Sequence, residues 1–311
     1  MSTGETKETT TATTALEMDD GEGHDQLSLL ALRLVSHHKR MSLFRRILSF
    51  HKTKSPKDYI NLRSSSKLFH SVLRPPPLWT SFPCSNHATL QSLVNRLEEL
   101  QGDEESRGNV PSVLFIEEGE FSSAEGNYVE VKKPLSIYGA GCGKTTLVGV
   151  GLLIEGNKSD GIVEIEDLTI KGAKKNGLCV IGKDFYTCGM HVIMRGCSIE
   201  DCQEVGVFAN NADISCDDLQ VVGCGQSGVL AHNNATITLS GQGTTIQGNV
   251  TNQAEGDCGY FYGLHTFNSD SSEIHLVHPL TKEQISTNNW GGNWGGRGSI
   301  LNLSKEQSMY C

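Results

Sequence analysis

Three ten-residue stretches that align without gaps decide the fold of this chain. They are Leu168-Thr-Ile-Lys-Gly-Ala-Lys-Lys-Asn-Gly177, Cys197-Ser-Ile-Glu-Asp-Cys-Gln-Glu-Val-Gly206 and Leu219-Gln-Val-Val-Gly-Cys-Gly-Gln-Ser-Gly228. Each is followed by a short apolar run, and the offsets between them are 29 and 22 residues. A partial fourth copy, Thr244-Thr-Ile-Gln-Gly-Asn249, follows 25 residues after the third.

Repeats of roughly 20–30 residues that combine short strands with glycine turns are typical of solenoids. The units are too short for two helices each, and they lack a leucine ladder, so the pattern predicts a parallel β-helix. Equivalent positions then stack one above another, about 4.8 Å apart. We expect two inward stacks of buried side chains, which are Ala173, Cys202 and Cys224, and Leu168, Cys197 and Leu219. Asp201 stands where the other copies have glycine, which predicts a turn.

The distribution of glycine divides the chain. Three of the 34 glycines lie in residues 1–100 and 31 lie in residues 101–311. Hydrophobic residues make up 37% of the chain, which is enough for a core. We therefore predict five segments: a disordered tail (1–25), a helical region (26–83), an amphipathic capping helix (84–104), the β-helix (105–278) and a C-terminal Gly/Trp tail (279–311). The helix would begin after Ser85 or Asn86 and end at Gly102.

Charge and cysteine content restrict the partners and the compartment. Residues 31–80 contain 11 Lys/Arg and one acidic residue, whereas the whole chain has a net charge of −10. An acidic β-helix disfavours nucleic acid as its ligand. No run of about 18 apolar residues exists, so we expect no membrane span. The N-terminus lacks the pattern of a signal peptide, which predicts a cytoplasmic or nuclear protein whose ten cysteines are free thiols.

The motif Gly139-Ala-Gly-Cys-Gly-Lys144-Thr-Thr is close to a phosphate-binding loop but one residue short of it. A strand pattern, Leu147-Val-Gly-Val-Gly-Leu-Leu-Ile154, follows it where such a loop needs a helix. We therefore expect no nucleotide cofactor and no metal. His232 and His265 have no defined partner in the sequence, and we expect both on the surface.

A family resemblance supports the fold. Gly119-Glu-Phe121, Tyr128-Val-Glu-Val131, Leu135-Ser-Ile-Tyr-Gly139-x-Gly141 and Thr146-Leu-Val-Gly149 resemble the first coils of the pectin-lyase-like superfamily. The resemblance covers residues 109–275 and implies a right-handed parallel β-helix. Members that cleave polysaccharides carry short Asp- and His-containing signatures that are absent here. The candidate acidic clusters of this chain are Glu164/Glu166/Asp167, Glu200/Asp201 and Asp217/Asp218. Asp201 is expected to be a solvated turn residue, and we predict a chain that is not an enzyme.

The helical region contains Leu43-Phe44-x-x-Ile47-Leu48-x-Phe50, Asp58-Tyr-x-Asn61-Leu62-x-x-Ser65-Ser66-Lys67-x-Phe69 and Leu78-Trp79. These residues resemble an F-box, a three-helix unit that docks onto the Skp adaptor of cullin–RING ubiquitin ligases. The match spans residues 43–82, without the opening Leu-Pro-x-Glu of the motif. It implies adaptor-binding residues Leu43, Phe44, Ile47, Leu48, Leu62, Lys67, Phe69 and Trp79. By this resemblance the chain is a substrate-recognition protein, in which the β-helix binds an unknown substrate protein.

Two other functions remain open. The first is a carbohydrate-active lyase or hydrolase, which a carboxylate trio stacked on one face of the fold would favour. The second is a basic helical module that binds anionic surfaces through Arg45, Arg46, Lys52 and Lys54. We take the substrate-recognition protein as the leading expectation.

Overall fold

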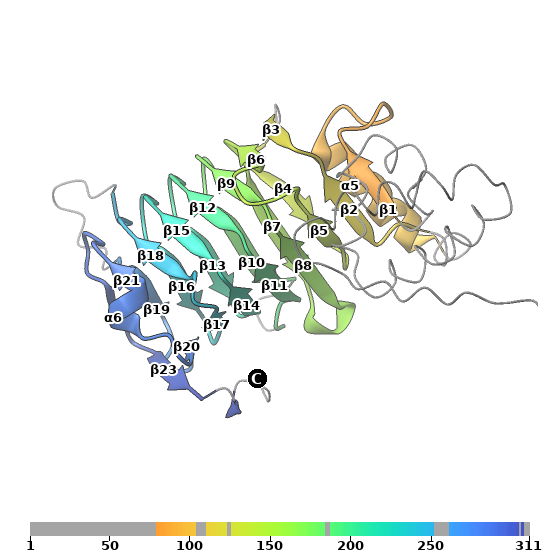
Figure 1. Cartoon of the computed structure of the whole chain (residues 1–311). Coiled ribbons are helices and arrows are strands. Elements are labelled where there is room, and N and C mark those ends of the chain that lie inside the picture. The colour runs from red at the N-terminus through yellow and green to blue at the C-terminus, as the bar shows by residue number, and fades with distance from the viewer. Residues whose placement is uncertain are drawn as a thin grey trace, which may run out of the picture. The chain divides into compact units, whose positions relative to one another are not determined.

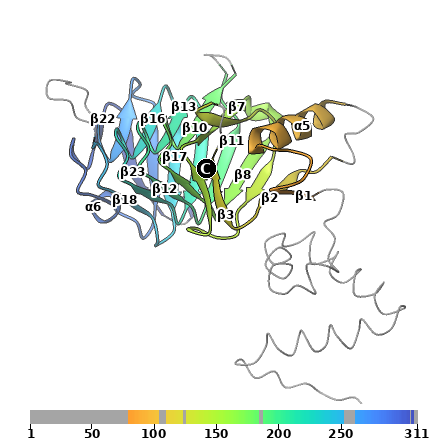
Figure 2. The same cartoon turned by 90° about the horizontal axis from the view of Figure 1, so that it is seen from above.

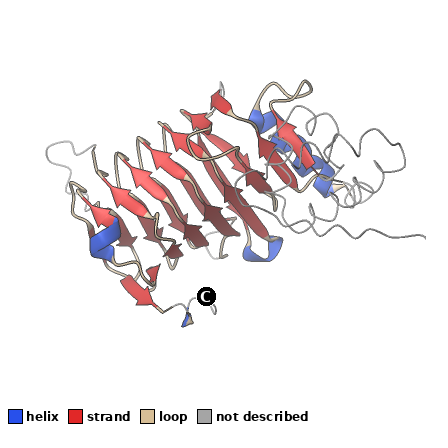
Figure 3. Ribbon diagram, in the orientation of Figure 1, coloured by secondary structure: helices blue, strands red, loops and turns tan. Residues whose placement is uncertain are grey.

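A computed structural model of the whole chain describes residues 79–103, 110–122, 126–183, 187–251, 261–304 and 306–307. Contacts between residues divide the chain at residue 74 into two units. The unit that extends from Pro75 to the C-terminus is a parallel β-solenoid, which confirms the predicted fold class (Figure 1). Strands dominate it and helices are few (Figure 3).

Three parallel sheets run along the solenoid axis. Each coil contributes one strand to each sheet in turn, and the two seven-stranded sheets correspond to seven coils. Sheet 1 has nine strands, in the spatial order β1 (Trp79–Phe82), β2 (Val113–Ile116), β5 (Ser136–Tyr138), β8 (Ile162–Glu166), β11 (His191–Arg195), β14 (Asp213–Asp217), β17 (Thr236–Ser240), β20 (Glu273–Val277) and β23 (Ser299–Leu303).

The other two sheets have seven strands each. Sheet 2 consists of β3 (Gly119–Ser122), β6 (Thr145–Val148), β9 (Thr169–Lys171), β12 (Ser198–Glu200), β15 (Gln220–Val222), β18 (Thr245–Gln247) and β21 (Ser286–Thr287). Sheet 3 consists of β4 (Tyr128–Val131), β7 (Gly151–Gly156), β10 (Leu178–Gly182), β13 (Val207–Asn210), β16 (Val229–His232), β19 (Leu264–Phe267) and β22 (Trp294–Gly296). Figure 2 shows the succession of coils from above.

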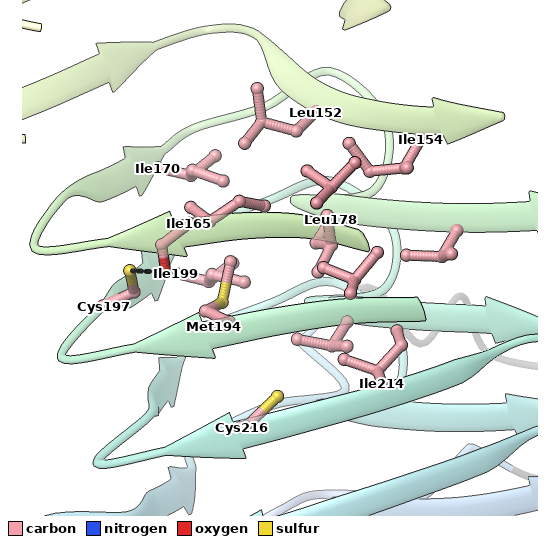
Figure 4. Packing of buried hydrophobic residues seen from close by; sticks show 14 of the residues in the cluster. Leu152, Ile154, Ile165, Ile170, Leu178, Met194, Cys197, Ile199, Ile214 and Cys216 are labelled. Atoms are coloured by element: carbon pink, nitrogen blue, oxygen red, sulfur yellow. Dashed lines mark hydrogen bonds between the residues drawn. The ribbon is translucent and has the colours of Figure 1, made fainter. Parts of the chain in front are cut away.

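The register of the strands reproduces the sequence repeat. Thr169 pairs with Ser198 and Ser198 with Gln220, so the three aligned stretches occupy equivalent places in successive coils. Both predicted inward stacks are confirmed, because every member is at most 1% exposed; the members are Ala173, Cys202 and Cys224, and Leu168, Cys197 and Leu219. Figure 4 shows how Cys197 and Cys216 fill the core beside Ile, Leu and Met side chains.

The turns between sheets use the left-handed backbone region. Asp201 has φ +53°, and Gly172 and Gly223, its equivalents in neighbouring coils, have φ +62° and +71°. Aspartate and asparagine tolerate this region better than most residues that have a side chain. The predicted turn at Asp201 is therefore confirmed, and it closes the corner between sheets 2 and 3.

Helix α5 (Leu90–Gly102) covers the N-terminal end of the core with a buried apolar face of Leu90, Leu93, Val94 and Leu97. Its N-cap is Thr89, whose hydroxyl accepts a hydrogen bond from Ser92 N, and not the predicted Ser85 or Asn86. Gln91 also pairs with the edge strand β4. Its Oε1 accepts from Glu130 N at 2.6 Å and its Nε2 donates to Glu130 O at 3.1 Å. One side-chain amide thus satisfies part of an exposed sheet edge.

The C-terminal residues continue the solenoid. Strands β21, β22 and β23 and the short helix α6 (Lys282–Ile285) lie within the range that the sequence predicts as a tail. Trp294 pairs in register with Leu264, and Lys282 Nζ lies 4.9 Å from the centroid of the Trp294 ring. The side chain of Trp290 is 80% exposed. A short 3-10 helix, η1 (Lys158–Asp160), lies between β7 and β8.

Candidate functional site

The outward face of sheet 1 brings three carboxylates together. Glu164 and Glu166 are two residues apart on β8, so both side chains point away from the core, while Val163 and Ile165 between and beside them are fully buried. In the next coils Glu166 pairs in register with Arg195, and Arg195 pairs with Asp217. Three successive strands therefore place the acidic Glu166, the basic Arg195 and the acidic Asp217 in one column.

Arg195 joins the two carboxylates of β8. Its Nη1 lies 2.6 Å from Glu166 Oε1 and 3.7 Å from Glu164 Oε1. Burial acts to lower the pKa of Arg195, but the hydrogen bond and charge of Glu166 and the charge of Glu164 raise it above its usual value. The side chain of Glu166 is 12% exposed, whereas that of Glu164 is 32% exposed. Glu164 is therefore the carboxylate of this pair that a ligand reaches more easily.

Two hydroxyls of β5 hold Glu164 from the other side. Its Oε2 accepts a hydrogen bond from Ser136 Oγ at 3.1 Å and one from Tyr138 OH at 3.3 Å. Burial, together with the charges of Glu164 and Glu166, raises the pKa of Tyr138 to about 12. The phenol therefore stays protonated at neutral pH and acts as a donor. These bonds fix the orientation of the Glu164 carboxylate.

Asp217 has a different environment. Its Oδ1 accepts a hydrogen bond from Ser240 Oγ at 2.8 Å. Within the part of the chain that the structure describes, no basic side chain forms an ion pair with it. The three carboxylates are thus chemically inequivalent, because Glu164 and Glu166 have an arginine beside them and Asp217 has a hydroxyl. Inequivalent carboxylates on one face are what general acid and base catalysis requires.

A second set of polar groups continues this face toward the loop side of sheet 1. Lys158 Nζ contacts Asp213 Oδ2 at 2.7 Å, and Ser215 Oγ lies 3.2 Å from His191 Nε2. Burial lowers the pKa of His191, against the charge of Asp213, so this imidazole is neutral at pH 7. Among the described residues, no group of three or more His, Cys, Asp or Glu side chains lies close enough to hold a metal ion.

The sequence contains a signal for this column. The repeat offset of 29 residues leads from Glu166 to Arg195, and the offset of 22 residues leads from Arg195 to Asp217. The alternating pattern Ile162-Val-Glu-Ile-Glu166 also predicts that both glutamates share a face. The column is missed when each acidic cluster is considered by itself, because Arg195 and Tyr138 belong to none of these clusters.

The residues expected to bind an adaptor lie almost entirely outside the described part of the chain. These are Leu43, Phe44, Ile47, Leu48, Leu62, Lys67 and Phe69. The basic residues Arg45, Arg46, Lys52 and Lys54 lie outside it as well. Trp79 is described, and it lies in strand β1 paired with Val113. No helix of the described residues is long and apolar enough to span a membrane.

The loop of residues 139–144 opens strand β6, as its sequence predicts. Its backbone amides are engaged within the solenoid. Gly139 N donates to Glu166 O at 2.8 Å, Ala140 N to Thr145 Oγ1 at 2.8 Å and Gly143 N to Thr169 Oγ1 at 2.9 Å. A phosphate-binding loop needs such amides free to point at a ligand.

The expectation that both histidines lie on the surface is wrong for His265. This residue is 3% exposed, and its Nδ1 lies 3.0 Å from Ser227 Oγ. His232 is half-buried and stacks on Phe267. The reason is that both residues belong to an aromatic cluster on sheet 3, which combines side chains from several coils.

Comparison with known proteins gives three matches, all among solved structures. No family model and no curated protein matches the chain. The structures are the catalytic domain of a GH87 α-1,3-glucanase in complex with nigerose, and two aspartate-to-alanine variants of such a domain in the same complex. Sequence identity is 16–18%, and the TM-scores are 0.33, 0.29 and 0.31.

The matches cover 72–75% of this chain and 40–46% of the glucanase domains, so the chain spans less than half the length of these structures. At this identity the likeness concerns the fold alone. All three structures are catalytic domains of a glycoside hydrolase, so the expectation that this chain is not an enzyme is not supported by them. The chain is a parallel β-solenoid whose fold is similar to that of glycoside hydrolase catalytic domains.

Proposed function

We propose that this chain is a carbohydrate-active protein that binds a glycan along the outward face of sheet 1 and hydrolyses a glycosidic bond there. The observation that carries the proposal is the carboxylate trio of Glu164, Glu166 and Asp217 on one solvent-facing surface. Glycoside hydrolysis needs two carboxyl groups that flank the bond, one as acid and one as base. The trio supplies such a pair together with an arginine that positions it.

The roles follow from exposure and partners. Glu164, held by Tyr138 and Ser136, is the base that activates water, and Asp217 is the acid that protonates the leaving oxygen. Two strand spacings and two residues separate them, which puts their Cα atoms about 10–12 Å apart. Glu164 bonds toward β5 and Asp217 toward β17, so a bound glycan must turn the two side chains toward each other to reach the ~6.5–9.5 Å of inverting glycosidases. Glu166 and Arg195 are positioning residues.

The test is incubation of the full chain with separate glycans, including α-1,3-, β-1,3- and β-1,4-glucans and pectate, followed by measurement of new reducing ends. We expect Glu164→Gln and Asp217→Asn each to lower the rate by at least about 100-fold, since general acid–base catalysis contributes that much. Glu200→Gln is the matched control, because Glu200 forms an ion pair with Lys171 on sheet 2, at 3.4 Å. Cleavage of none of the glycans, or an equal loss in the control, would overturn the proposal.

A second candidate function rests on the residue pattern of positions 43–82. We propose that this region docks onto a Skp-type adaptor, and that the solenoid then presents a bound protein to a cullin–RING ligase in the cytoplasm or nucleus. Full-chain protein with Ile47→Asp and Phe69→Asp should lose capture by purified adaptor, while Lys174→Asp, an exposed change on the solenoid, should retain it. Absence of capture by the unmodified chain at micromolar concentration would exclude this candidate.

A further inference from the structure

The outward face of sheet 3 carries a stripe of aromatic rings across three coils. Phe208 on β13, His232 on β16 and Phe267 on β19 follow one another along the solenoid axis. The ring centroids of Phe208 and His232 are 5.9 Å apart, and those of His232 and Phe267 are 5.6 Å apart with planes inclined by 18°. Phe267 is 49% exposed although its strand belongs to the core of the fold. Exposed aromatic rings that gather on one face mark a binding surface.

A buried histidine beside the stripe, two residues from Phe267 on β19, holds it in place. His265 packs edge-on against Phe267, with ring centroids 5.5 Å apart, and against Tyr262, at 5.3 Å. Its Nδ1 lies 3.0 Å from Ser227 Oγ, and both residues are at most 3% exposed. Burial lowers the pKa of His265 to about 4 and also lowers the pKa of His232. Both imidazoles are therefore neutral at pH 7, and the stripe has no charge.

A row of side-chain amides runs beside the rings. Asn233 Nδ2 donates to Asn210 Oδ1 at 3.0 Å, and Asn268 Nδ2 donates to Asn233 Oδ1 at 2.9 Å. Ser269 Oγ donates to Asn234 Oδ1 at 2.6 Å in the same turns. Each amide offers two donor hydrogens and an oxygen with two lone pairs, so one bond to each neighbour leaves capacity for a ligand. The amides are spaced by the coils, as the rings are.

We propose that this aromatic–amide stripe binds an uncharged sugar chain that lies along the solenoid axis. A pyranose ring has an apolar face of C–H groups, which packs on aromatic rings, and hydroxyl groups at its rim, which exchange hydrogen bonds with amides. An acidic or basic ligand finds no complementary charge within the stripe. Asp270, three residues after Phe267, and Arg297, whose backbone N donates to Thr266 O, have opposite signs. An uncharged polymer with apolar and polar sides therefore fits this surface best.

The inference goes beyond the proposed hydrolysis, because the stripe lies on sheet 3 and the carboxylate trio lies on sheet 1. Binding here requires no cleavage. A chain that binds glycan on sheet 3 without hydrolysing it would contradict the proposed function and support this inference. A chain that hydrolyses glycan but shows no binding at the stripe would support the proposed function and contradict this inference.

The experiment is calorimetric titration of the full chain with neutral hexasaccharides of α-1,3-, β-1,3- and β-1,4-linked glucose, with an oligogalacturonate as the charged comparison. We expect binding of at least one neutral chain, weakened at least tenfold by Phe267→Ala and by Asn210→Ala. Trp290→Ala is the matched control, because Trp290 is also an exposed aromatic ring, at 80%, but is not part of the stripe. Glu200→Gln, a change on sheet 2 in an ion pair with Lys171, should leave this binding unchanged.

Three results would overturn the proposal. They are no heat of binding for any neutral hexasaccharide at millimolar concentration, equal affinity in the Phe267→Ala variant, and preference for the oligogalacturonate. Circular dichroism of Phe267→Ala and Asn210→Ala checks that both variants fold. Because both side chains are on the outer face, we expect native spectra, and a variant that fails to fold is replaced by Phe267→Leu.

Discussion

Replacement of Gly206 by alanine tests the close approach of successive coils. A Cβ atom at this position would lie 2.3 Å from Val221 Cγ1, 2.6 Å from the backbone oxygen of Gly228 and 3.3 Å from Cys224 Sγ. Carbon atoms in favourable contact are about 3.5–4.0 Å apart, so the first overlap exceeds about 1 Å. The Gly228 oxygen accepts a ladder bond from Val207 N at 2.9 Å and cannot move without weakening it.

The expected cost of Gly206→Ala is about 3 kcal/mol of the free energy of unfolding, at the upper end of the range for overpacked cores. Gly206 does not have a positive φ, so none of this cost comes from backbone strain. Gly172→Ala is the control in which backbone strain is present and steric overlap is absent. Gly172 has φ +62°, and no atom lies within 4 Å of its Cβ position. It should cost only about 1–2 kcal/mol, which is the penalty of the left-handed region.

Urea unfolding followed by far-UV circular dichroism measures both variants. With a slope of about 1–3 kcal/mol per molar, a loss of 3 kcal/mol lowers the midpoint by roughly 1 M or more. A Gly206→Ala variant whose midpoint equals that of the unmodified protein would refute the reasoning. The double variant Gly206→Ala/Val221→Ala should recover part of the loss, because only the side-chain overlap is removed and the overlap with the carbonyl oxygen remains.

Three further outcomes are expected from burial and charge. In native protein treated with iodoacetamide, peptide mass spectrometry should find exposed Cys142 alkylated and buried Cys197 protected, because burial raises the pKa of Cys197 to about 12; rapid labelling of both would contradict this. Burial lowers the pKa of His265 to about 4, so the folded state disfavours its protonated form, and stability should fall by about 2–3 kcal/mol as the pH drops from 6.5 to 4. The fall should be smaller in His265→Gln, and an identical pH profile in that variant would refute the assignment. Arg195→Met should lower the free energy of unfolding, measured in urea, by about 1–2 kcal/mol, because it leaves the mostly buried carboxylate of Glu166 without its partner. Lys171→Met removes one member of an exposed pair and should change this free energy by at most about 0.5 kcal/mol. Equal effects of the two substitutions would contradict the prediction.

The core and its repeat could be predicted from the sequence because they depend on local pattern. Inward positions of a coil must be apolar and small enough to stack. Alignment of the repeats therefore assigns Cys197, Cys202 and Cys224 to inward positions, and all three are buried. Corners need the left-handed region, which Asp201 and the glycines equivalent to it supply. The start of α5 is not fixed by the sequence pattern, because Thr89, Ser85 and Asn86 all have suitable capping side chains and only the packing of the helix selects Thr89.

The candidate sites depend on tertiary structure. Outward positions carry no hydrophobic pattern, and their neighbours are set by the lengths of the loops between repeats, which differ from coil to coil. Strand pairing places Arg195 between Glu166 and Asp217, and it places Phe208, His232 and Phe267 in one stripe. The solenoid, its inward stacks and its corners therefore follow from the local sequence pattern. Which exposed side chains meet depends on the stacking of the coils, because residues far apart in sequence become neighbours only when the coils stack.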